Sequence, residues 1–273
     1  MAWVRPNRPP TGPLDTVPGP LDRLVAATER LTSTYAGPDW FEEMARARQE
    51  FEQRRGKVYQ DEPMFEAQLS AFLEWYVLDR PLGDGQTPVL RALEASSARG
   101  EVDEALRALA RSFRGLFEVV EVLRRETLLR DLLRGGLWRV RQDPPLPGID
   151  ADDIFEARLL PWSSPSGSGE VRFGPLFCFH PRAARPSILQ LLETLEARGP
   201  LGPEVLNILA VMRLNHERFR NITIDRIYSL SWRGGGDARR RGAPVARQAT
   251  ATSTTPEAED EQRSPESGEG EGR

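Results

Sequence analysis

The spacing of apolar residues changes twice along this chain, and that change constrains the fold more than any other feature. Up to about residue 113, apolar side chains recur every three or four positions, which places them on one face of a helix. Between residues 116 and 180 the pattern becomes that of short strands, and after residue 180 the helical spacing returns. Because each helix or sheet must bury its apolar face against another element, this order predicts an α+β protein.

The central region contains five candidate strands. They are rich in β-branched and aromatic residues, and short polar or glycine-containing connections separate them. Strands this short and this closely spaced predict a small antiparallel β-barrel of the SH3 or OB type, or a curled sheet. The candidate strands are LFEVVEVL (116–123), TLLRDLL (127–133), LWRVR (137–141), IFEARLLPW (154–162) and VRFGPLFCFH (171–180).

The same patterns divide the chain into five regions. The first twenty residues hold six prolines, which fix the backbone and remove hydrogen-bond donors, and the residues after 232 are poor in apolar side chains. The expected regions are a disordered Pro-rich arm (1–20), a helical bundle (21–113), a small β domain (114–183), C-terminal helices that pack on the β domain (184–232) and a disordered tail (233–273). Within the fourth region, residues 221–232 fit either a strand or a short helix.

Cysteine content and charge bear on the compartment and on the class of partner. The chain has one cysteine, Cys178, and no apolar run long enough to cross a bilayer, so we expect a cytoplasmic protein without membrane contact. Residues 113–183 hold ten arginines and ten acidic residues, and this neutrality argues against tight binding to a phosphate backbone. Segment 233–247 is basic, with five arginines and one aspartate, whereas residues 256–273 are acidic.

Three residues are candidates for metal or thiol chemistry. Cys178 and His180 alternate onto one side of their predicted strand, and His216 with Glu217 could complete a zinc site with them. However, the apolar neighbours of Cys178 would raise the pKa of its thiol. His216 follows Met212 by four residues on the apolar face of a predicted helix, where a hydrogen-bonded core histidine is expected. We therefore predict no catalytic, cofactor-binding or metal-binding residue and no cofactor.

A set of charged residues is the candidate for a clamp between the bundle and the β domain. The segment FLEWYVLDRPL (72–82) must end its helix near Arg80, because Pro81 disfavours helical geometry at the preceding residue. Residues one position apart on a helix do not face each other, so Asp79 and Arg80 should each find a partner elsewhere. Arg130–Asp131 has the inverse order, which makes cross-pairing conceivable. The set is Asp79, Arg80, Arg130, Asp131, Glu156 and Arg158.

Six segments of the chain form a recognisable set: FLEWYVLDRPL with Thr87–Pro88 after it, GLFEV (115–119), LRDLL (129–133), DIFEARLLPW (153–162), FCFHPR (177–182) and ERFRN (217–221). Together they resemble an uncharacterised family of bacterial proteins, mainly from myxobacteria and related deltaproteobacteria. The resemblance spans roughly residues 40–230 and implies domain limits but no activity. The first half also resembles the helical part of bacterial proteins that end in a cysteine-rich SEC-C zinc motif, which a single cysteine cannot build.

These observations favour a non-enzymatic adaptor or regulatory component that binds a protein partner. Nucleic-acid binding through the β domain and segment 233–247 is an alternative, because aromatic residues alternate with arginines in the strands as in a stacking platform. A metal-dependent or thiol enzyme that uses Cys178, His180 and His216 is a second alternative. The residues of the stacking platform would be Trp138, Phe155, Phe173, Phe177 and Phe179, with Arg139, Arg141, Arg158 and Arg172.

Overall fold

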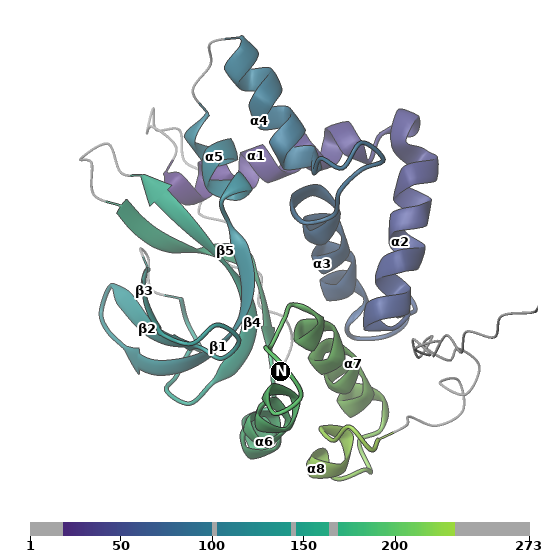
Figure 1. Cartoon of the computed structure of the whole chain (residues 1–273), viewed down its shortest axis with the longest axis vertical. Helices are drawn as coiled ribbons and strands as arrows, with labels where there is room; N and C mark the ends of the chain where they lie inside the picture. The colour runs from purple at the N-terminus through teal and green to yellow at the C-terminus, as the bar shows by residue number, and fades with distance from the viewer. Residues whose placement is uncertain (1–18, 100–102, 143–145, 164–168, 233–273) are drawn as a thin grey trace, which may run out of the picture. The chain divides into compact units, whose positions relative to one another are not determined.

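The computed structural model describes residues 19–99, 103–142, 146–163 and 169–232, all within the compact unit Met1–Arg233. Helices come first, five strands follow and helices return, so the α+β prediction is confirmed (Figure 1). The expected tail (233–273) and nearly all of the expected N-terminal arm lie outside the described residues. None of the described helices is both long and apolar enough to span a bilayer.

Two of the N-terminal helices begin at residues whose side chains cap them. Thr87 caps one helix by accepting a hydrogen bond from the Leu90 N–H, with Pro88 in the first turn. Asp103 caps the next helix by accepting from two backbone N–H groups. The helices are α1 (Pro20–Tyr35), α2 (Phe41–Arg55), α3 (Phe65–Leu78), α4 (Pro88–Ala98) and α5 (Glu104–Ala110), with a 3-10 turn (Pro38–Trp40) before α2.

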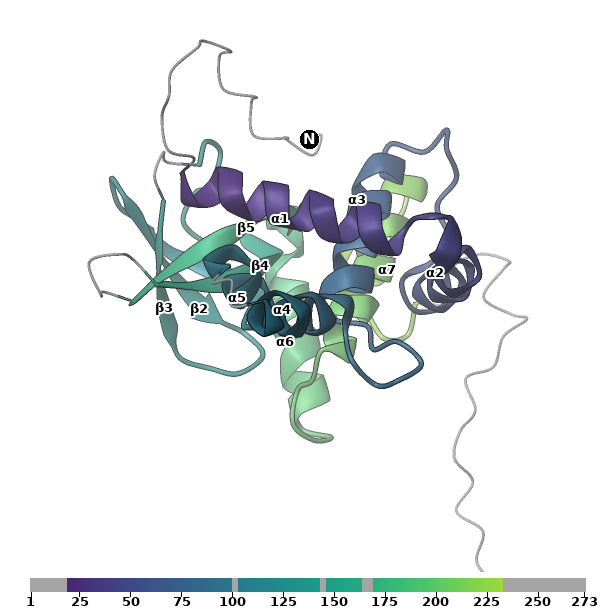
Figure 2. The same cartoon turned by 90° about the horizontal axis from the view of Figure 1, so that it is seen from above.

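Helix α1 packs along both the other helices and the β domain. Near its start, the Arg23 guanidinium lies over the Trp162 ring at 5.1 Å from the ring centroid. At its end, the Tyr35 carbonyl accepts a hydrogen bond of 3.1 Å from the hydroxyl of Tyr76 in α3. Helix α1 therefore reaches from the strands towards α3, as Figure 2 shows. The bundle and one face of the β domain consequently share an apolar core that includes Leu160 and Trp162.

The five strands form a closed barrel in the order β1-β2-β3-β5-β4, with β4 paired back to β1. The return of β4 beside β1 makes a Greek key, and a five-stranded Greek-key barrel is of the OB type rather than the SH3 type. The strands are β1 (Phe113–Val122), β2 (Glu126–Asp131), β3 (Leu137–Arg141), β4 (Ile154–Ser163) and β5 (Gly169–Phe179).

One strand pair corrects the expectation of purely antiparallel pairing. Strands β3 and β5 run parallel and share a single register pair, Arg141 with Arg172. This follows from the strand order, because β4 is antiparallel to β1 and β5 is antiparallel to β4. Strand β5 therefore runs in the direction of β1 and β3. The barrel interior is filled by side chains that include Phe117, Leu129 and Phe155, all fully buried.

The chain then returns to helices, which pack on the same outer face of β1 and β4 as the bundle but nearer the start of β4. A 3-10 turn (Arg182–Ala184) leads into α6 (Arg185–Glu196), α7 (Glu204–Arg218) and the short α8 (Ile224–Ile227). The ambiguous segment 221–232 thus forms a short helix and turns. Ile188 of α6 and Leu206 and Leu209 of α7 pack in one apolar cluster with Leu116 and Ile154 of the strands. Helix α7 is also tied to the loop before α3, since Arg218 donates to Glu62.

Candidate functional site

Six charged side chains form a chain of alternating sign between the helices and the barrel. Arg55 donates to both carboxylate oxygens of Glu156, at 3.0 and 2.7 Å. Arg114 lies 3.3 Å from Glu156 and 3.2 Å from Asp79. Arg158 donates to Asp79 at 2.5 Å and to Glu74 at 2.7 Å. We call this set the buried ion chain: Arg55, Glu156, Arg114, Asp79, Arg158 and Glu74.

The elements that carry the buried ion chain meet where α2 and α3 pack on the barrel. Arg55 ends α2, while Glu74 lies on α3 and Asp79 caps its C-terminus. Glu156 and Arg158 lie two residues apart on β4, so their side chains leave the strand on the same side. Arg114 is the register partner of Arg158 on β1. The chain therefore joins two helices to two strands that are distant in sequence.

Neighbouring charges stabilise the charged forms of Arg158 and Glu156 in the buried ion chain. Arg158 is 2% exposed, and burial alone would lower the pKa of its guanidinium, but Glu74 and Asp79 outweigh burial and raise it. Burial would likewise raise the pKa of Glu156, yet Arg55 and Arg114 bring it below its ordinary value. Both residues are therefore charged in the folded protein at neutral pH. Three arginines and three carboxylates leave the set without net charge.

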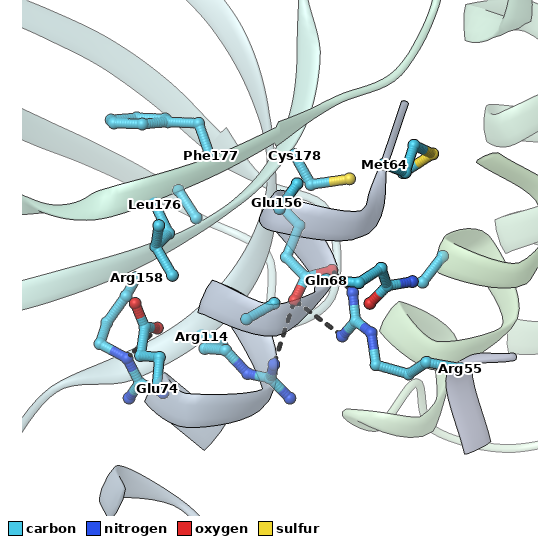
Figure 3. Close-up of a pocket in the computed structure, with 14 residues that line it drawn as sticks. Arg55, Met64, Gln68, Glu74, Arg114, Glu156, Arg158, Leu176, Phe177 and Cys178 are labelled. Carbon is cyan, nitrogen blue, oxygen red and sulfur yellow. Dashed lines mark hydrogen bonds and ion pairs between the residues drawn. The ribbon is translucent and has the colours of Figure 1, made fainter. Parts of the chain in front are cut away.

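A small pocket lies beside the buried ion chain. Its volume is about 30 Å³, which is far below the several hundred Å³ of a typical organic-ligand site. This volume suffices for about two water molecules. Figure 3 shows Glu156 in this pocket, with dashed lines to Arg55 and Arg114. The other side chains that line it come from α3, α7, the segment before α3, and strands β4 and β5: Met64, Ala67, Gln68, Ala71, Glu74, Ala157, Arg158, Leu176, Phe177, Cys178 and Ala210.

Burial shifts the pKa of the thiol and of both histidines. Burial raises the pKa of Cys178 to about 12, so its thiol is protonated at neutral pH. His180 is buried with Nδ1 3.0 Å from the Tyr228 hydroxyl, and burial lowers its pKa to about 3. Burial also lowers the pKa of His216. In the part of the chain that the structure describes, no three His, Cys, Asp or Glu side chains are grouped so that they could hold a metal ion.

The six charged residues named from the sequence fall into two groups. Asp79, Glu156 and Arg158 belong to the buried ion chain. Arg80 donates instead to Glu43 and Glu50 within the bundle, at 2.5 and 2.9 Å. Arg130 donates to Glu118, and Asp131 accepts from the backbone N–H groups of Leu133 and Arg134. Arg80 and Asp131 thus have partners other than each other.

Three residues of the buried ion chain were not predicted from the sequence: Arg55, Glu74 and Arg114. Glu74 had a recognisable signal, because it is the one acidic residue between Phe72 and Val77 on a helix that is apolar around most of its girth. An acidic side chain in that position must find a cation. Arg55 and Arg114 carried no such signal, since each lies at the end or start of its element, where arginine is common.

Comparison with known protein families places most of the chain in one family. Residues 28–197 match the model of a family described as a family of unknown function (DUF7986), and this match covers more than half of the chain. The chain belongs to the DUF7986 family. The region that DUF7986 covers includes all six residues of the buried ion chain. Neither the curated proteins nor the solved structures contain a protein similar to this chain.

Membership of DUF7986 agrees with the expectation of an uncharacterised family. The match carries no statement about source organisms or about a zinc motif. The resemblance to myxobacterial proteins and to the helical part of SEC-C proteins therefore stays a prediction.

Proposed function

We propose that this DUF7986 protein is a non-enzymatic adaptor or regulatory component and that the β1–β2 hairpin of its barrel contacts a protein partner. One observation carries the proposal. Val120 and Val122 at the end of β1 and Leu123 just after it are 37%, 41% and 38% exposed. Arg124 and Arg125 come next, and both are exposed.

A β-bulge is the reason for part of this exposure. The β1–β2 register shifts between Val119 and Glu121, so Val120 has no partner residue on β2. Two backbone hydrogen bonds define the turn: the Leu123 N–H donates to Glu126, and the Arg125 carbonyl accepts from Gln142. The aliphatic side chains are therefore presented on an ordered frame, which limits the entropy lost on binding.

The chemistry of the hairpin indicates the kind of partner. Protein interfaces combine an apolar centre with arginine, which is enriched there while lysine is depleted. Three aliphatic side chains beside two arginines fit a protein segment that carries aliphatic and acidic residues. The groups that could perform chemistry have structural environments instead: Cys178 is a protonated buried thiol, and His180 binds Tyr228.

The proposal is tested by site-specific photo-crosslinking in the native host. A photoreactive residue at the exposed Glu121 position should give a discrete crosslink to a protein partner. Val122→Asp with Leu123→Asp should abolish that crosslink, because two carboxylates would oppose an acidic, apolar partner. Leu90→Asp is the matched control, since Leu90 is 42% exposed on α4, and it should leave the crosslink unchanged. A crosslink that survives the hairpin substitutions would refute the assignment of this surface.

The described barrel is a poorer binding surface for a nucleic acid than the β1–β2 hairpin is for a protein. Phe155 and Phe173 are buried in the barrel core, and Trp138 and Phe177 pack against it, whereas Phe179 is 37% exposed. The strand arginines are paired with carboxylates. A phosphate backbone that binds these arginines would have to displace the carboxylates. The pairs are Arg130 with Glu118, Arg139 with Glu126, and Arg141 and Arg172 with Glu170. The Arg-rich segment 233–247 lies outside the described residues.

A further inference from the structure

Two residues that line the pocket each carry a buried polar atom without a hydrogen-bond partner in the described part of the chain. The atoms are Nε of Arg55, a donor, and Oε2 of Glu74, an acceptor. The two residues are 3% and 7% exposed, so bulk water does not serve these atoms. A buried donor or acceptor without a partner is costly, because it has given up its hydrogen bonds to water. The pocket therefore calls for a bound group that can accept from Arg55 and donate to Glu74.

We propose that the pocket holds ordered water, about two molecules, that links Arg55 to Glu74. Figure 3 places these two side chains on opposite sides of the pocket, with Arg114 and Glu156 between them. A short file of water molecules can accept a hydrogen bond at one end and donate one at the other, as these two atoms require. The pocket's room of about 30 Å³ agrees with two molecules, since one water needs at least about 10–15 Å³ measured in this way.

Charge balance selects a neutral occupant over an ion. Arg55, Arg114 and Arg158 line the pocket together with Glu74 and Glu156, and the remaining positive charge is matched by Asp79, which binds Arg114 and Arg158. An added anion or cation would leave an unbalanced buried charge, which is unfavourable in a medium of low dielectric. Water satisfies both open atoms without adding charge.

A third polar group is available to hold the water in place. Gln68 of α3 lines the pocket, and its side-chain amide makes no hydrogen bond within residues 19–232 as far as the structure describes them. Buried water molecules make about three hydrogen bonds on average. Arg55, Glu74 and Gln68, together with the second water molecule, supply that number. The junction between the helices and the barrel is therefore hydrated beside the buried ion chain.

The first test counts the internal water of the whole protein. Water-oxygen magnetic relaxation dispersion on the full chain should detect long-lived water, and a high-resolution crystal structure should show it in contact with Arg55 Nε and Glu74 Oε2. Ala67→Leu on α3 extends a buried side chain into the pocket. This variant should lose the pocket's share of the dispersion amplitude and unfold at a lower temperature than the parent.

A matched control and a milder variant make the test decisive. Ala92→Leu on α4 adds the same side chain against the bundle core, away from the pocket, and should leave the water signal unchanged. If Ala67→Leu does not fold, Ala71→Leu, which fills the pocket from a partly exposed position, takes its place with the same expectation. Electron density for an empty pocket in the parent protein, or a pocket-filling variant that folds with a raised unfolding temperature, would overturn the inference.

Discussion

Arg114 of β1 and Arg158 of β4 lie directly opposite each other in the barrel, and the carboxylate of Asp79 binds both of them. Like charges in directly opposed positions destabilise a strand pair. Asp79 would itself be unfavourable at a helix C-terminus, where the helix dipole is negative. The carboxylate of Asp79 offsets the repulsion between the two arginines, and the arginines offset the unfavourable position of Asp79. These charges therefore hold the end of α3 against the two strands.

Replacing Asp79 should therefore cost more than the loss of a surface ion pair. We expect Asp79→Ala to lower the free energy of unfolding by about 3–5 kcal/mol, because it leaves two buried guanidinium groups facing each other. Urea denaturation followed by far-UV circular dichroism measures this. Asp84→Ala is the control, since Asp84 pairs with Arg91 at the surface and its loss should cost less than about 1 kcal/mol. Equal effects of the two substitutions would contradict the role given to Asp79.

Arg55 and Glu156 should show strong energetic coupling. Arg55→Met or Glu156→Gln alone should destabilise the protein by about 3–5 kcal/mol, because each leaves its partner buried without a counter-charge. The double variant should cost about 2 kcal/mol less than the sum of the two, since Arg114 retains Asp79 as a partner.

The exposed pair Arg139–Glu126 gives the reference cycle for this coupling. Its nitrogen and oxygen atoms are 2.9 Å apart, close to the distance between Arg55 and Glu156, but both side chains are in solvent. We expect a coupling energy below about 1 kcal/mol there, as for other exposed pairs. A coupling for Arg55–Glu156 no larger than this reference would mean that burial does not strengthen the interaction.

His180 should make the protein less stable as the pH falls. Its pKa is about 3 in the folded protein, lowered by burial from the ordinary value of 6.5, so the unfolded chain binds a proton first. The contribution of His180 is complete above pH 6.5 and is lost progressively towards pH 3. The free energy of unfolding should fall by about 1.4 kcal/mol per pH unit across this range.

Urea denaturation midpoints measured between pH 7 and about pH 5 test this dependence. Carboxylates do not interfere in that range: the pKa of Glu156, for example, lies below 4.5, so its contribution to stability is lost only at lower pH. His180→Gln should flatten the profile. His216→Gln should retain most of it, since His216 is partly exposed and does not bind Tyr228. A His180→Gln profile as steep as that of the parent would show that another group titrates.

Local patterns in the sequence predicted the elements well but not their partners. Strand β3 (Leu137–Arg141) has the predicted limits because alternation and glycine turns are local signals. The need of Asp79 for a distant partner also followed from the sequence, because Asp79 and its neighbour Arg80 do not face each other on a helix. That its partners are Arg114 and Arg158 depends on β4 returning beside β1, and no local pattern indicates a Greek-key order. Arg55 and Glu156 are separated by 101 residues, so only the tertiary structure brings them together.

Gly174 tests how closely β5 must approach the buried ion chain. A Cβ atom at this position would lie 3.1 Å from Cβ of Arg158, which is tighter than normal contact. Gly174→Ala should therefore push β5 away from β4 and lower the free energy of unfolding by about 1–3 kcal/mol. Gly169→Ala on the same strand is the control, because a Cβ there meets no atom within 4 Å. Thermal unfolding under identical conditions should give a lower unfolding temperature for Gly174→Ala than for Gly169→Ala. An equal loss of stability in both variants would show that strand flexibility, and not contact with Arg158, causes the effect.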